Sequence, residues 1–145
     1  MYGVTGRDYT FINRPELLSV QVLAYIGDAV YELAVREYLV SLGFAKMDKL
    51  HKEAVQYVRA STQAEVLHII EDYLSEEELA VVRRGRNTKI NHCPKGAEVI
   101  EYRYSTAFES LIGYLYFKGA HERLGELINL VFSKFKKKVN SESKK

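Results

Sequence analysis

LAYIGDAV, residues 23–30, stands inside the long apolar stretch that decides the fold. Around it, apolar residues recur three and four positions apart, which is the spacing of a helix. This spacing predicts one helix that begins near Asn13 and Pro15 and runs to about Leu42, with Gly43 as its stop. We expect it to be the central, largely buried helix of a bundle, because its apolar positions cover most of its circumference. These positions are Leu17, Leu18, Val22, Leu23, Ile26, Val30, Leu33, Ala34 and Leu39.

The rest of the chain shows the same helical spacing and little alternation of period two, so we expect an all-α protein. Ser75-Glu76-Glu77-Glu78 is a capping box, in which each end residue can bond the backbone amide of the other. Gly, Asn and Pro predict a loop over residues 85–97. Further helices are expected over residues 47–59, 62–73, 75–84, from 98 or 101 to 117, and 121–135.

The length of 145 residues is typical of one domain, and 47% hydrophobic residues exclude a disordered chain. We expect an irregular lead-in over residues 1–14, one folded domain over 15–135, and a basic, disordered tail over 136–145.

Cysteine usage and apolar runs predict the compartment. The single Cys93 excludes an intramolecular disulfide framework and favours a reducing compartment. No apolar run approaches the ~18 residues of a membrane span, and the first residues lack the features of a signal peptide. We therefore expect a cytoplasmic protein.

The net charge of +2 hides an uneven distribution of charge. Residues 1–82 carry 7 basic and 13 acidic groups, whereas residues 83–103 carry 6 basic and 2 acidic groups. Residues 134–145 are again basic, with 6 basic groups and 1 acidic group. Such a chain could hold cations at one place and a polyanion at another.

Asp28 and the preceding Gly27 interrupt the apolar helix, and two explanations are open. Gly27 could allow another helix to approach closely, with Asp28 on a narrow polar stripe together with Glu32. Alternatively, Asp28 points into a cleft where a cation balances its charge, because a buried carboxylate is costly unless it is paired or metal-bound.

Glu109 is a second lone carboxylate in an apolar helical run, four residues before Gly113. Facing helices of a bundle that each contribute a carboxylate are a common way to build a site for a hard cation. A pairing of Glu109 with Arg36 or Arg103 is the open alternative.

A basic segment lies between these two acidic parts of the chain. Arginine binds phosphate bidentately, so the segment is a candidate phosphate-binding surface, although a solvated face is equally compatible with it. The candidate residues are Arg83, Arg84, Arg86, Lys89, Lys95 and Arg103. Cys93 and the four scattered histidines form neither a metal-ligand spacing nor a catalytic triad.

The ordered series of motifs resembles the ribonuclease III catalytic domain, and most closely its short subfamily, mini-ribonuclease III. The Gly-Asp pair follows two apolar residues on a long helix in LAYIGDAV, and TAFESLIG, residues 106–113, resembles the second motif. The strings LHK, QAE, RRGRN, YRYSTAFE and GYL extend the resemblance over about residues 17–130. The resemblance implies the helical bundle of a ribonuclease III endonuclease domain over residues 15–135.

In that family, the residues that match Asp28 and Glu109 are catalytic magnesium ligands. The sequence departs from the wider family at two positions where a carboxylate is expected: seven residues before Asp28 it has Gln21, and three residues before Glu109 it has Thr106. We expect Asp28 and Glu109 to be the essential pair, with Mg²⁺ as cofactor. Gln21 and Thr106 are expected to hold water around the ion.

The resemblance also implies an activity and its partners. It implies an endoribonuclease that hydrolyses double-stranded RNA as a homodimer, with one active site per subunit, and matures the paired ends of precursor large-subunit (23S) ribosomal RNA. A large-subunit ribosomal protein is a further candidate partner. The alternatives are a non-catalytic RNA-binding or ribosome-assembly module of the same fold, and an interaction domain whose buried carboxylates only pair with arginines.

Overall fold

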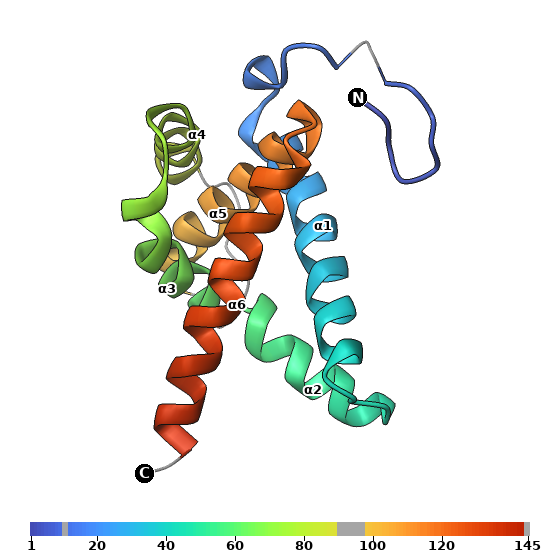
Figure 1. Ribbon diagram of the computed structural model, residues 1–145. Helices are drawn as coiled ribbons and strands as arrows, with labels where there is room; N and C mark the ends of the chain where they lie inside the picture. Colours follow the sequence, from blue (N-terminus) through green and yellow to red (C-terminus); the bar gives the residue numbers. More distant parts are fainter. Residues whose placement is uncertain (10–11, 90–97, 144–145) are drawn as a thin grey trace.

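The computed structural model describes residues 1–9, 12–89 and 98–143, with side chains in the last helix as far as Phe135. These residues form an all-α fold, as the sequence predicts, with a single isolated β-bridge between Tyr2 and Asp8 (Figure 1). The elements are η1 (Pro15–Leu17), α1 (Val20–Ser41), α2 (Met47–Val58), α3 (Ala60–Ile70), η2 (Glu71–Tyr73), α4 (Glu76–Asn87), α5 (Val99–Lys118) and α6 (His121–Ser143).

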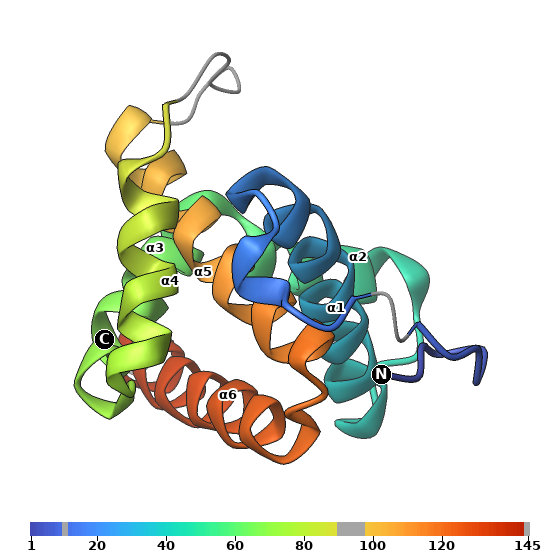
Figure 2. The same cartoon turned by 90° about the horizontal axis from the view of Figure 1, so that it is seen from above.

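The central helix of the bundle is α5, which corrects the expectation that the first long helix occupies this place. Figure 2 shows α5 between α1 on one side and α3 and α4 on the other. Ten residues of α5 are buried, and they cover most of its circumference. By contrast, α1 buries a stripe three and four residues apart and leaves Val22 and Leu33 with 45% and 52% of their surface exposed. Leu17, also expected in the core, lies in η1 and is 67% exposed.

Two glycines allow α1 and α5 to pack backbone against backbone. A Cβ on Gly27 would lie 1.7 Å from the carbonyl oxygen of Glu109, and a Cβ on Gly113 would lie 1.9 Å from that of Leu23. Real Cβ atoms do not approach other atoms so closely, so the two helices can meet in this way only through glycine. The contact brings Asp28 and Glu109 onto adjoining turns of neighbouring helices.

An aromatic cluster joins α1, α2, α5 and α6. Tyr31 packs edge-on against Phe108 with ring centroids 4.9 Å apart, and Tyr38 stacks on Phe132 at 4.4 Å. Tyr57 of α2 meets Phe132 edge-on at 5.8 Å. Edge-on and offset ring pairs are favourable beyond the area that they bury. The cluster therefore fixes α2 and α6 on the α1–α5 pair.

Four helices, α1, α3, α4 and α6, begin or end at other residues than predicted. Ser19, whose hydroxyl accepts from the Val22 amide, begins α1, and Pro15 begins η1 instead. The third helix begins at Ala60 and ends at Ile70, where η2 continues the chain. The predicted capping box of Ser75 and Glu78 is present at the start of α4.

The other two differences are later helix ends than the sequence predicts. Helix α4 continues through Gly85 and Arg86 to Asn87, so residues 85–87 are not part of a loop. Helix α6 continues past Phe135 to Ser143, in keeping with the absence of Gly and Pro from that segment. No helix in the described ranges is both long enough and apolar enough to cross a membrane.

Candidate active site

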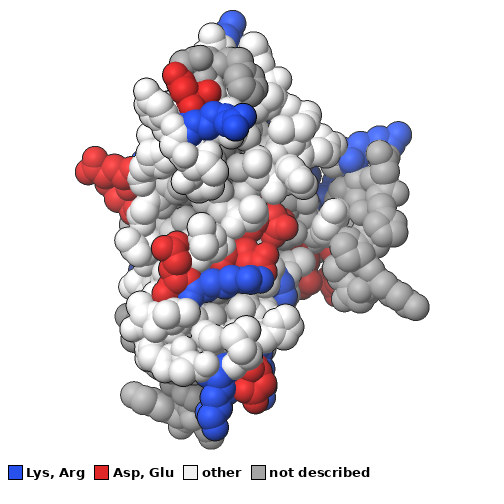
Figure 3. All heavy atoms as spheres, turned by 90° about the vertical axis from the view of Figure 1, so that its right-hand side faces the viewer, with Lys and Arg blue, Asp and Glu red and all other residues white. Residues whose placement is uncertain are grey.

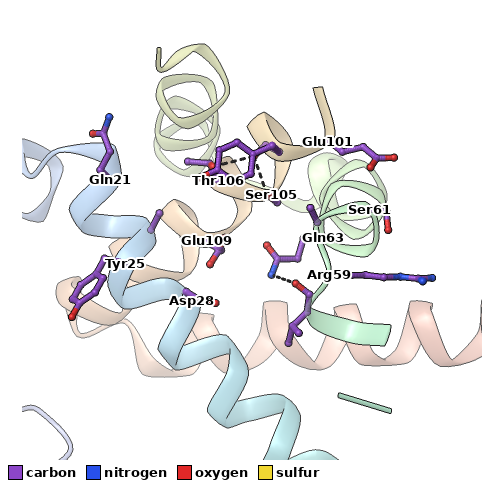
Figure 4. Close-up of a pocket in the computed structure, with 14 residues that line it drawn as sticks. Gln21, Tyr25, Asp28, Arg59, Ser61, Gln63, Glu101, Ser105, Thr106 and Glu109 are labelled. Carbon is purple, nitrogen blue, oxygen red and sulfur yellow. Dashed lines mark hydrogen bonds between the residues drawn. The ribbon is translucent and has the colours of Figure 1, made fainter. Parts of the chain in front are cut away.

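A pocket of about 780 Å³ opens where α1, α5 and the junction of α2 and α3 meet (Figure 4). It contains both carboxylates that the sequence singles out. Its lining residues are Gln21, Ala24, Tyr25, Asp28, Val58, Arg59, Ala60, Ser61, Gln63, Glu101, Tyr102, Ser105, Thr106 and Glu109.

Asp28 and Glu109 reach this pocket from neighbouring helices. Figure 4 shows the Asp28 side chain leaving α1 and the Glu109 side chain leaving α5 toward the same space in front of α3. Gly27 is explained by close packing, because its Cα faces the backbone carbonyl of Glu109 itself. Close packing of the helices at Gly27 is therefore confirmed. Asp28 lines the pocket, and a cation that balances its charge stays a prediction.

The two carboxylates repel each other in a partly buried place. Burial, the charge of Asp28 and a side-chain hydrogen bond with Asp28 raise the pKa of Glu109 to about 9. Arg36 does not relieve this repulsion, since its guanidinium bonds Glu32 at 2.9 Å. Within the described ranges, no ion pair joins Glu109 to Arg36 or to Arg103. A bound cation would lower the pKa of Glu109, because opposite charge favours the ionised form.

Gln21 and Thr106 line the same pocket, but the structure does not direct either side chain at the carboxylates. The Gln21 amide points away from Asp28 and Glu109 in Figure 4. The Thr106 hydroxyl donates to the backbone carbonyl of Tyr102 at 2.9 Å. Their expected role as holders of water around the ion stays a prediction.

Gln63 of α3 is a pocket residue that the sequence analysis did not select. Only 2% of its surface is exposed, and its Nε2 donates to the carbonyl of Val58 at 2.9 Å. Its Oε1 has no hydrogen-bond partner among the described residues, and in Figure 4 this oxygen points toward Glu109. Gln63 is the first residue of the string QAE that extends the resemblance, but the string does not show that this glutamine lines the pocket.

Within the basic segment, residues 83–87 belong to α4 and residues 99–103 to α5, and its arginines have different roles. Arg84 donates to the backbone carbonyls of Glu16 and Leu18, both at 2.9 Å, and so ties α4 to the segment before α1. Gly85 is a packing position, where a Cβ would lie 2.6 Å from the Cα of Ala107.

None of the predicted phosphate-binding residues lines the pocket. Arg83, Lys89 and Arg103 are exposed, Arg86 is half-buried, and Lys95 lies outside the described residues. Arg59, which the sequence analysis did not select, is the basic residue that lines the pocket, and its Nε donates to the Thr62 hydroxyl at 3.1 Å.

The chemistry of the pocket fits a hard cation. Its two inward carboxylates and the free Gln63 oxygen are all acceptors, which suits the oxygen preference of Mg²⁺. No group of three or more His, Cys, Asp and Glu side chains is placed to bind a metal in the part of the chain that the structure describes. Two carboxylates are nevertheless sufficient for Mg²⁺, which keeps several of its waters and also binds substrate phosphate.

The chain matches a known protein family over a range that contains both Asp28 and Glu109. The model of the ribonuclease III domain matches residues 21–120. A "Mini-ribonuclease 3" of Thermoanaerobacter sp. (strain X514) is 54% identical over 113 residues, which are 78% of this chain and 80% of that protein. A "Mini-ribonuclease 3" of Enterococcus faecalis is 45% identical over 130 residues, or 88% of this chain and 94% of that protein.

A solved structure supports the fold independently. An X-ray structure of a protein from Fusobacterium nucleatum superposes with a TM-score of 0.73 at 31% identity. The superposition covers 81% of this chain and 94% of that one.

Proposed function

The chain belongs to the ribonuclease III family and is an endoribonuclease, and from this premise we propose that it cleaves double-stranded RNA with Mg²⁺ held by Asp28 and Glu109. The observation that carries the proposal is the meeting of these two carboxylates in one pocket. They are distant in sequence, and the Gly27 and Gly113 contact is what joins their helices. Both residues lie inside the matched range of 21–120.

Asp28 and Glu109 would hold the cation, each through carboxylate oxygens. When bound, Mg²⁺ lowers the pKa of a coordinated water and neutralises charge on the phosphoryl oxygens. The chain contributes the fixed positions of the two carboxylates, because both leave rigid helices in direct backbone contact. Precise placement of the reacting groups accounts for much of the barrier lowering in such reactions.

The RNA backbone would be bound by basic side chains outside the pocket. Arg83, Lys89 and Arg103 are exposed and free to contact phosphates, with Arg86 and Lys95 as further candidates. Such contacts recognise the A-form shape of double-stranded RNA more than its sequence. Arg84 is the exception in the predicted set, because its guanidinium is committed to the backbone of Glu16 and Leu18.

A homodimer would bring two such sites onto one duplex, each cutting one strand. The exposed apolar residues of α1 support this part of the proposal, since Val22, Tyr25, Leu33 and Val40 are between 45% and 78% exposed. Figure 3 shows the side of the molecule that carries α1, where uncharged side chains cover much of the surface. Exposed apolar faces of this kind are typical of association surfaces.

The substrate we propose is the paired ends of precursor 23S ribosomal RNA, cut in the cytoplasm, with a large-subunit ribosomal protein as candidate partner. This choice rests on the resemblance to mini-ribonuclease III, and the similarity to proteins of that name supports it. Incubation with a transcript that pairs the two ends of the precursor tests it. Cuts only at random positions in the duplex would contradict a maturation role.

The catalytic proposal is tested by cleavage of long double-stranded RNA with and without Mg²⁺. Asp28→Asn and Glu109→Gln each remove a ligand charge without changing side-chain size, so we expect cleavage to fall at least about 100-fold, with fold and RNA binding retained. EDTA should abolish the fragments made by the unaltered chain.

Glu32→Gln is the matched control, because Glu32 lies one turn after Asp28 on α1 but pairs with Arg36 outside this pocket. It should cleave as the unaltered chain does. Full activity of Asp28→Asn or Glu109→Gln would contradict the two-carboxylate site. RNA binding without Mg²⁺-dependent cleavage would indicate a non-catalytic RNA-binding module.

A further inference from the structure

The side-chain amide of Gln63 is buried in the wall of the pocket and has no role in the proposed chemistry. It lies in the first turn of α3 and is 2% exposed. The preceding residue, Thr62, is equally buried, and its hydroxyl donates to the carbonyl of Gln56 at 2.6 Å. The two side chains thus bind two carbonyls near the end of α2 and fix the junction between α2 and α3.

The orientation of the Gln63 amide follows from its partner. The Val58 carbonyl can only accept a hydrogen bond, so the group that faces it at 2.9 Å must be Nε2. Oε1 must then face the pocket. No donor among the described residues reaches this oxygen.

The pocket itself cannot supply the missing donor from its nearest hydroxyls. The Ser105 and Thr106 hydroxyls both donate to the carbonyl of Tyr102 at 2.9 Å. Asp28, Glu101 and Glu109, the carboxylates that line the pocket, are acceptors when ionised. A buried carbonyl oxygen without a partner costs free energy, so a donor bound in the pocket would stabilise this oxygen.

We infer that Gln63 is a positioning residue of the cation site, whose Oε1 accepts a hydrogen bond from a water molecule in the hydration shell of the ion held by Asp28 and Glu109. The inference rests on the proposed function, since it needs that ion. A site with only two carboxylates leaves the ion most of its waters. A neutral acceptor on α3 would hold one of these waters on the side of the pocket facing α1 and α5.

The experiment measures Mn²⁺ binding to the full chain without RNA, by the electron paramagnetic resonance signal of the free ion. Gln63→Met keeps the side-chain length and removes the acceptor. We expect the dissociation constant for Mn²⁺ to rise about tenfold, as is usual when a partner of the outer coordination shell is lost.

Thr62→Val is the control for the junction of α2 and α3, because it removes the neighbouring hydrogen bond to the end of α2 at a residue that does not itself line the pocket. It also releases the Nε of Arg59, which donates to the same hydroxyl. We expect its Mn²⁺ affinity to stay within about twofold of that of the unaltered chain. This change is smaller than the loss of about tenfold or more that is usual when an outer-shell partner is removed. Equal weakening in Thr62→Val and Gln63→Met would overturn the inference, because it would show that only the junction of α2 and α3 matters.

Gln63→Glu gives a test in the opposite direction, which stands even if Gln63→Met does not fold. It keeps an acceptor oxygen at this position and adds a charge, and it loses the hydrogen bond that Nε2 donates to the Val58 carbonyl. We therefore expect Mn²⁺ affinity to rise about tenfold, while the free energy of unfolding falls. An unchanged affinity in Gln63→Glu would overturn the inference.

Asp28→Asn separates this inference from the proposal on which it rests. Loss of Mn²⁺ binding in Asp28→Asn, with Gln63→Met and Gln63→Glu both binding as the unaltered chain does, would refute the role of Gln63 alone. Unchanged Mn²⁺ binding in Asp28→Asn would refute the cation site itself, and with it both statements.

Discussion

Gly27 is the residue on which the geometry of the site depends most directly. Its Cα faces the carbonyl of Glu109, and the adjacent Asp28 lines the pocket. A side chain here must push α1 away from α5, since the obstacle is backbone and cannot rotate aside. The same displacement would move Asp28 away from Glu109.

We therefore expect Gly27→Ala to lower the free energy of unfolding by about 3 kcal/mol or more, at the upper end of the usual cost of overpacking. Urea unfolding followed by circular dichroism measures this change. Cleavage by the folded fraction should also fall, because the two carboxylates no longer share one pocket.

Gly125 of α6 is the matched control for Gly27. A Cβ there meets nothing within 4 Å, so Gly125→Ala should stabilise the chain by up to about 1 kcal/mol through helix propensity alone. If Gly27→Ala proved as harmless as Gly125→Ala, the close contact between α1 and α5 would be wrong.

At the same scale, the sequence predicts some site residues better than others. Asp28 and Glu109 stand out because a carboxylate next to glycine is unexpected in an apolar helix. Gln63 gives no such signal, since its role depends on which way its amide turns after α2 and α3 meet. Gln21 shows the converse problem, because a place near Asp28 in sequence does not direct its side chain toward the carboxylates.

At the scale of elements, the basic C-terminal part of α4 combines a structural arginine with an arginine that is exposed to solvent. Arg83 is exposed, whereas Arg84 bonds two carbonyls of the segment before α1. Arg83→Ala should reduce the slope of log affinity against log salt by about 1. Arg84→Ala should leave the slope unchanged and lower the free energy of unfolding by about 1–2 kcal/mol through its two lost hydrogen bonds.

Filter binding to double-stranded RNA over a range of salt concentrations measures the slope, and urea unfolding measures the stability. The two variants are controls for each other, because they change the same residue type at adjacent positions of one helix. A drop in slope for Arg84→Ala with unchanged stability would contradict this division.

Another tie at this scale joins α4 to α6 through Glu78 and Arg123. Arg123 donates to both Glu78 carboxylate oxygens at 2.8 Å, and these bonds are the main reason why the pKa of Glu78 is lowered. A lowered pKa in the folded state means that the stabilisation is complete above the ordinary pKa of Glu. It is lost as the pH falls through the folded-state value.

Glu78→Gln should accordingly lower the free energy of unfolding by about 1–3 kcal/mol at neutral pH. The difference should shrink toward zero at a pH acidic enough to protonate Glu78 in the folded state. Thermal unfolding at both pH values measures this. Glu126→Gln removes the more exposed partner of Arg123 and should change stability by less than about 0.5 kcal/mol. A loss for Glu78→Gln that is equal at both pH values would contradict an ionic origin.

Element boundaries show why sequence signals succeed or fail locally. The capping box at Ser75 is a complete signal, since its two hydrogen bonds involve only residues close in sequence. Gly85 misleads, because glycine is usually a helix breaker and here is a packing position against Ala107. When a glycine is required by contact with a helix distant in sequence, local composition cannot distinguish the helix that contains this glycine from a loop.

At the scale of the whole molecule, local composition likewise explains why the prediction of α1 as the central helix is wrong. Its apolar residues surround most of the helix, and from sequence alone this implies burial in the chain's own core. The structure buries only one stripe of α1 and leaves Val22, Tyr25 and Leu33 exposed. In the proposed homodimer a second copy of the chain would cover these residues, and sequence periodicity cannot distinguish such an interface from a core.

Leu33 is the residue that tests this explanation. It is 52% exposed and borders a groove between α1 and α6 that also includes Val30, Tyr38 and Phe132. Leu33→Glu places a charge on this apolar face, and burying an unpaired charge in an interface is costly. Sedimentation velocity at micromolar concentration should therefore find a monomer where the unaltered chain is a dimer.

Val4→Glu is the control, because Val4 is 83% exposed and lies in the segment before α1. It should remain dimeric and cleave normally. In the proposed dimer each site would cut one strand, so Leu33→Glu should also lose coordinated cutting of both strands, which native gels of a nicked and a fully cut duplex distinguish. A Leu33→Glu chain that stays dimeric would exclude this face as the interface, and the exposed apolar residues of α1 would then need another partner.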